Sequence, residues 1–238
     1  MLDEADLGEF MSRFFGYGTW AAPFWFIGME EGGGTSEAEI ASRLTTWSAR
    51  GRKYLEDLAG YSGELGITQW FGDAAKLQPT WRCLARVFLA YKGVVHPGRG
   101  TVIKTQCTRL GSENGKAALL ELLPLPSPGI GQWNYGGMTD LPLLRDRATY
   151  TSKLLPMRAA RLHEKIRAHQ PDVVVCYGLA YREAWERVAG APFSGNEDDL
   201  PMARVGRSLV VVMRHPAAHG VSRAYFQHVG ETLARMAT

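Results

Sequence analysis

Four short apolar runs recur along this chain, and each is followed within a few residues by glycine or proline. They cover residues 24–27, 117–123, 173–178 and 209–213. Runs of this length that are rich in aliphatic, β-branched and aromatic side chains are typical of strands buried on both faces. The chain must therefore fold with these strands inside a sheet that other elements cover.

Segments with helical spacing of their apolar residues separate the runs. Ser36 and Glu39 form a capping box that begins a helix or a helix pair, broken near Gly51. Pro79 suits the first position of a helix that Gly93 ends. We expect further helices over residues 158–169, 179–188 and 224–236. Strands that alternate with helices predict the α/β class, as a three-layer α/β/α sandwich with a central, mainly parallel β-sheet.

Length, charge and the N-terminus narrow the class of protein. The chain has 238 residues, 45% of them hydrophobic, which suffices for one large core, so we expect a single domain over residues 1–238. The net charge is only +3, so any contact with nucleic acid must come from a local basic patch. The chain begins without a basic and apolar leader, and no apolar stretch approaches the roughly 18 residues that span a bilayer. We expect a cytoplasmic monomer without membrane contact.

The cysteines indicate neither a disulfide framework nor a metal site. Cys83, Cys107 and Cys176 are isolated, with no C-x-x-C pair and no histidine at ligand spacing. We expect reduced thiols, no metal, no iron–sulfur cluster and no cofactor.

Polar residues follow the first and the last apolar run. Glu30 and Glu31 lie in a glycine-rich turn that begins at Gly28-Met29, and His215 follows Arg214 and precedes a proline. Because ligands of open α/β sheets bind beyond the carboxyl ends of the strands, these residues are expected to converge. The acids would orient water or stabilise a cation, and a neutral imidazole would donate a hydrogen bond. The alternative is two surface acids and an ordinary loop histidine.

Glu121 is unusual because it interrupts an apolar run. A charge there is costly unless it is paired or reaches a polar site. A carboxylate directed into a pocket would accept hydrogen bonds from the N4 amine of cytosine and repel the O4 of uracil. A position on an exposed edge of the sheet would imply no role in binding. The sequence leaves both positions, pocket and exposed edge, open.

Two other segments contain candidates for nucleic-acid contact. Residues 60–78 are glycine-rich and aromatic, and Trp70 and Phe71 at their centre are candidates for stacking on a base, together with Trp81 and Trp133. Aromatic residues are also common in cores. Around and after His215, a second set of residues would enter DNA or contact phosphate, unless this is an ordinary surface loop: Arg214, His219, Val221, Ser222 and Arg223.

Taken together, these motifs resemble the uracil-DNA glycosylase superfamily. That family has a G-x-[D/N] or G-E-A-P-G type loop after its first core strand, an H-P-S-P type loop after its last, and a base-reading Asn on a strand between them. Residues 28–32 resemble the first loop, residues 215–218 resemble the second, and Glu121 falls near the base-reading position. Glu30 and Glu31 stand where members carry other residues, and Ala217-Ala218 replaces Ser-Pro.

The resemblance implies a uracil-DNA glycosylase-like fold and a DNA glycosylase. Such an enzyme flips a nucleotide out of double-stranded DNA and hydrolyses its N-glycosidic bond, leaving an abasic site. It implies that Glu30 or Glu31 stabilises the sugar cation or positions water, and that His215 stabilises the departing base. Gly28, Met29 and Glu121 would contact the base.

The substrate implied by Glu121 is a modified cytosine, hydroxymethylated or glucosylated, since a carboxylate suits a cytosine-type amine. Members of the superfamily that attack such bases act in bacterial defence against phage. Two alternatives are a uracil-DNA repair glycosylase and a non-catalytic binder of DNA or modified nucleotides. A third, weaker one is a small-molecule hydrolase on the same scaffold.

Overall fold

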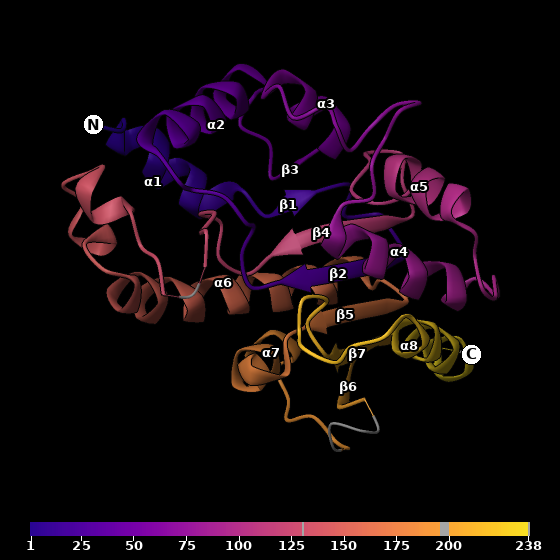
Figure 1. Ribbon diagram of the computed structural model, residues 1–238. Helices are drawn as coiled ribbons and strands as arrows, with labels where there is room; N and C mark the ends of the chain where they lie inside the picture. The colour runs from indigo at the N-terminus through magenta and orange to yellow at the C-terminus, as the bar shows by residue number, and fades with distance from the viewer. Residues whose placement is uncertain (130, 196–199, 238) are drawn as a thin grey trace.

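A seven-stranded sheet forms the centre of the computed structural model, which describes residues 1–129, 131–195 and 200–237. Positions 130, 196–199 and 238 of the expected domain lie outside the described residues. The strand order is β3-β1-β4-β2-β5-β7-β6 (Figure 1). The strands are β1 (Gly16–Tyr17), β2 (Phe24–Gly28), β3 (Leu55–Glu56), β4 (Ala117–Glu121), β5 (Val173–Tyr177), β6 (Met202–Val205) and β7 (Ser208–Met213).

The order of the four central strands creates a topological switch point between β2 and β5. Strands β4, β2, β5 and β7 are parallel, and Phe24 of β2 pairs with Ala117 on one side and Val173 on the other. After β2 the chain returns in β4 on one side, and after β4 it crosses to β5 on the opposite side of β2. Open sheets bind ligands at such a reversal, beyond the carboxyl ends of the strands. The topology therefore places a site where β2 and β5 end.

Helices cover both faces of the sheet (Figure 1). On one face, Phe24 and Phe26 pack in a core with residues of α2, α4 and α8. On the other face, Trp25 and Ile27 pack with residues of α6 and α7. This arrangement agrees with the expected three layers. The helices are α1 (Glu4–Arg13), α2 (Glu37–Ala49), α3 (Leu58–Glu64), α4 (Pro79–Tyr91), α5 (Arg99–Thr108), α6 (Arg147–His169), α7 (Arg182–Ala189) and α8 (Arg223–Met236).

The central elements match the sequence predictions, and the short peripheral ones do not. The structure confirms the four apolar runs as parallel strands and α4 and α8 as helices. Of the two alternatives for the segment that begins at Ser36, the helix pair broken near Gly51 is confirmed, since α2 ends at Ala49 and α3 begins at Leu58. A single helix is wrong, because residues 55–56 pair with β1 as strand β3. Helix α6 begins eleven residues earlier than predicted: Asp146 caps it, accepting a hydrogen bond from the Thr149 N–H, and Pro156 is tolerated inside. The sequence patterns did not predict α1, α5, β1, β3 or β6.

Among the described residues, no helix combines the length and the apolar character that crossing a bilayer requires.

Candidate active site

A cavity of about 780 Å³ opens at the carboxyl ends of the four central strands. Four strand ends contribute to its walls: residues 29–32 after β2, Glu121 of β4, residues 177–181 at the end of β5, and residues 214–215 and 217–219 after β7. The start of α4 closes another side with Trp81. The structure therefore brings together Glu30, Glu31, Glu121 and His215, which the sequence analysis singled out from segments far apart in the chain.

Glu30 is a largely buried carboxylate that lines the cavity, with one oxygen held by an arginine and the other buried without a hydrogen bond from the described residues. Its Oε1 accepts a hydrogen bond from Arg147 at the start of α6, whereas Oε2 is buried and receives none from the described residues. Burial raises the pKa of this carboxyl, and the hydrogen bond from Arg147 opposes the rise. Arg147 also donates to the Ser127 hydroxyl at 2.9 Å, so the guanidinium is fixed from two sides.

One oxygen of Glu31 is held by two donors of the protein. Its Oε2 accepts hydrogen bonds from the Tyr17 hydroxyl at 2.8 Å and from Arg43 Nη1 at 3.1 Å. Arg43 is itself buried and pairs with Glu39 as well. The sequence left open which of the two acids acts. Because Glu31 accepts from an arginine and a tyrosine and Glu30 from an arginine alone, Glu30 is the less neutralised acid and the better candidate.

Glu121 lies inside the protein rather than on an exposed edge. Its residue surface is 8% exposed, and no described residue donates a hydrogen bond to Oε2. Burial, and then the negative charges of Glu31 and Glu30, raise the pKa of this carboxyl well above its ordinary value. The protonated form therefore persists to higher pH than in an exposed glutamic acid. A buried cation behind the strand, Arg158, donates to the Glu121 and Leu122 carbonyls and fixes the end of β4.

Gly28 allows this packing. A Cβ at this position would come closer than van der Waals contact to the Tyr177 hydroxyl and to Glu121 Oε2. The absence of a side chain at the end of β2 lets the tyrosine and the acid approach the backbone on the floor of the site. The predicted role of Gly28 at a base is thus indirect, since it makes room for the groups that line the cavity.

His215 has the protonation state that a hydrogen-bond donor needs. Its Nδ1 accepts a hydrogen bond from the Ala217 N–H at 3.0 Å, so the proton of the neutral ring lies on Nε2. Burial lowers the pKa of this histidine, which favours the neutral ring near pH 7. The ring centroid lies 5.5 Å from that of Tyr177. His215 can therefore donate from Nε2 to an atom bound in the cavity without carrying a charge.

Trp70 and Phe71 do not line this cavity, in contrast to the expectation that they stack on a base. The Gln106 side chain donates to the Trp70 carbonyl at 2.9 Å and holds that turn against α5. Phe71 packs on Trp81, with ring centroids 5.8 Å apart, and Trp81 is the residue that reaches the cavity. Trp133 packs on Tyr135 and Tyr150, away from the cavity lining.

The residues expected to contact DNA divide between two neighbouring depressions. Arg214 and His219 line the cavity, and the backbone N–H of Arg214 donates to the Tyr225 hydroxyl at 2.8 Å. Val221, Ser222 and Arg223 line a separate, smaller pocket beside it. Met29, expected at the base, does line the cavity.

Three side chains of the site were missed by the sequence analysis. Tyr177 ends a predicted strand, so the logic that selected Glu30 and His215 applied to it equally. Arg147 and Arg43 gave no such signal, because each lies on a helix and reaches its acid only through tertiary packing.

No group of three or more His, Cys, Asp or Glu side chains within residues 1–129, 131–195 and 200–237 is arranged to hold a metal ion.

Comparison with known proteins adds no assignment to this geometry. No family model matches the chain. No curated protein matches it significantly.

Proposed function

We propose that the protein is a DNA glycosylase with a uracil-DNA glycosylase-like fold, which binds a flipped nucleotide in the cavity and hydrolyses its N-glycosidic bond. The observation that carries the proposal is that Glu30, Glu121 and His215 line one cavity at the topological switch point of a parallel sheet. The order of these residues along the chain and their strand context match the resemblance drawn from the sequence.

The proposed mechanism divides the developing charges between two walls of the cavity. Breaking the N-glycosidic bond leaves positive charge on the sugar and negative charge on the base. Glu30, oriented by Arg147, stabilises the sugar cation or positions the attacking water. His215 donates from Nε2 to the departing base and stabilises its negative charge. The products are the free base and an abasic site.

The choice of base is proposed to depend on cavity size more than on Glu121. In its protonated form Glu121 has a donor and an acceptor side by side, which fits N3 and N4 of cytosine but equally N3 and O4 of uracil. The cavity of about 780 Å³ is in the upper range of small-molecule sites and leaves room for a bulky substituent. We therefore retain a hydroxymethylated or glucosylated cytosine in phage DNA as the proposed substrate, with uracil as the alternative.

The test is a set of duplexes that contain uracil, 5-methylcytosine, hydroxymethylcytosine or its glucoside, incubated with the protein and then cleaved with alkali. Strand scission at a modified cytosine is expected, and scission at uracil alone would contradict the proposed substrate. In Glu30→Gln and His215→Ala proteins we expect base release to fall by about 10²- to 10³-fold. Exposed positions provide matched controls, Glu113→Gln and His228→Ala, in which activity is retained.

One observation favours a non-catalytic binder instead. Both acids of the first loop are paired with arginines, which reduces the negative field that a sugar cation would meet. A binder predicts tight association with a modified duplex and no abasic product, with equal affinity in wild-type and Glu30→Gln proteins. Abasic product that disappears in Glu30→Gln would rule it out.

A further inference from the structure

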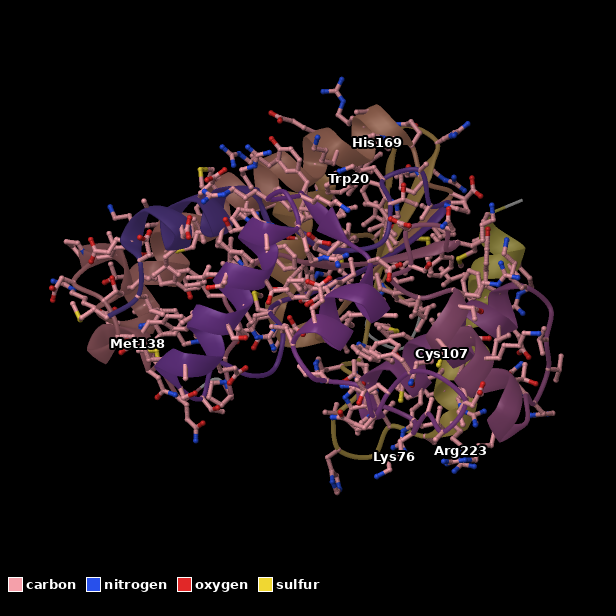
Figure 2. All side chains as sticks on the ribbon, turned by 90° about the horizontal axis from the view of Figure 1, so that it is seen from above. Trp20, Lys76, Cys107, Met138, His169 and Arg223 are labelled. Carbon is pink, nitrogen blue, oxygen red and sulfur yellow. The ribbon has the colours of Figure 1, made fainter. Side chains whose placement is uncertain are left out.

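A second depression, which the proposed chemistry does not use, lies beside the His215 loop. Its volume is about 410 Å³, and the first turns of α4, α5 and α8 meet around it. In Figure 2, Lys76 and Arg223 lie together at the edge of the molecule, although they are far apart in the chain. Its basic side chains define what we call the cationic pocket: Lys76, Arg82, Arg86, Arg99 and Arg223.

The positive charge of the cationic pocket is not neutralised by the described residues. No Asp or Glu of the described chain lines it, and none of its five cations makes an ion pair with a described carboxylate. Burial lowers the pKa of Arg86, and the like charges of Arg223 and Arg82 lower it further. Such mutual repulsion favours an anion with several oxygen atoms in the pocket.

Two helix N-termini add to this field. Helix α8 begins at Arg223, and α5 begins at Arg99 after Gly98, which provides no side-chain cap. The first N–H groups of a helix carry partial positive charge and bind phosphate readily. The cations and the two helix N-termini therefore all contribute positive electrostatic potential to the same pocket.

The cationic pocket shares its wall with the cavity. On α4, Trp81 lines the cavity and the next residue, Arg82, lines the cationic pocket. In the loop after β7, His215 lines the cavity and Pro216 lines the cationic pocket. One ligand can thus place a base in the cavity and a neighbouring phosphate in the pocket.

We propose that the cationic pocket binds phosphodiester groups of the DNA strand whose nucleotide enters the cavity. The identification of the phosphates as those of DNA rests on the proposed function. The attraction for phosphate rests on the five cations of the pocket and the two helix N-termini, and is independent of the proposed function. These residues then set much of the affinity for DNA of any sequence, and the cavity sets the choice of base.

The test compares the salt dependence of DNA binding between charge variants, using fluorescence anisotropy with a short unmodified duplex. Two cations are removed from the pocket in Arg86→Gln/Arg223→Gln. The control Lys116→Gln/Arg167→Gln removes two exposed cations that lie next to the amino ends of β4 and β5, at the opposite edge of the sheet. Since each phosphate contact contributes about 0.9 to the slope of log K against log salt, the pocket variant is expected to lose about 2 from that slope. The control keeps the wild-type slope.

Further measurements distinguish a loss of charge from a loss of folding. They also distinguish binding of DNA from binding of a free phosphate compound. Arg86→Lys/Arg223→Lys keeps the charge and is expected to retain the salt slope, and the thermal midpoint of Arg86→Gln/Arg223→Gln should be no lower than that of wild type. An equal loss of slope in the control, or no loss in the pocket variant, would overturn the proposal. So would stabilisation of wild type by pyrophosphate without any DNA binding, which would assign the pocket to a free phosphate compound. Salt-dependent DNA binding through the pocket without base release supports this proposal while refuting the glycosylase.

Discussion

Replacing Glu121 by glutamine should stabilise the protein, and increasingly so as the pH rises. Burial and two neighbouring acids raise the pKa of Glu121 in the folded state, so the folded protein holds this proton more tightly than the unfolded chain. The stabilisation that the wild-type carboxyl provides is complete below its unfolded pKa of about 4.3 and is lost as pH rises through the folded pKa. Glutamine has nearly the same shape and never ionises.

The magnitude follows from the same linkage. Each pKa unit by which the folded carboxyl exceeds the unfolded one corresponds to about 1.4 kcal/mol. For a chain of this length, 1 kcal/mol shifts the thermal midpoint by roughly 2–4 °C. The midpoint of Glu121→Gln at pH 8 should therefore exceed that of wild type by about 3–6 °C for each unit by which burial raises the folded pKa, and the two proteins should differ little below pH 4.5.

Thermal unfolding followed by circular dichroism between pH 4 and pH 8 measures this difference. The exposed Glu113→Gln variant is the control and should match wild type throughout. A Glu121→Gln protein that is less stable than wild type at pH 8, or an offset that does not change with pH, would show that Glu121 is ionised at no cost. The account of a neutral carboxylic acid at the base-binding position would then be wrong.

Two other predictions concern the floor and the wall of the cavity. Gly28→Ala should destabilise the protein by about 1–3 kcal/mol and abolish base release, because the added methyl overlaps Tyr177 and Glu121. The control Gly63→Ala, in a helix with open space around it, should instead stabilise by about 0.5–1 kcal/mol, and equal effects in urea unfolding would refute the packing argument. Because burial lowers the pKa of His215, the rate of base release should fall on acidification only below the ordinary histidine value of about 6.5. An acid limb that persists unchanged in His215→Gln would assign it to another group.

The central strands and the residues that follow them could be predicted from the sequence alone. A run such as residues 173–177 is apolar throughout and ends at glycine, so its conformation and burial are set by its own composition. Polar residues placed after such runs reach the carboxyl edge of a parallel sheet whatever the strand order. This is why Glu30 and His215 could be selected as neighbours before any fold was known.

The ion pairs of those residues, their pKa values and their access to the cavity were decided only by the tertiary structure. Arg147 pairs with Glu30 across 117 positions of the chain, and Trp81 rather than Trp70 reaches the cavity. The raised pKa of Glu121 likewise follows from burial among elements distant in sequence. Local pattern determines which segments become strands. Which charge is neutralised, and which side chain faces a ligand, depends on partners that only packing brings within a few ångströms.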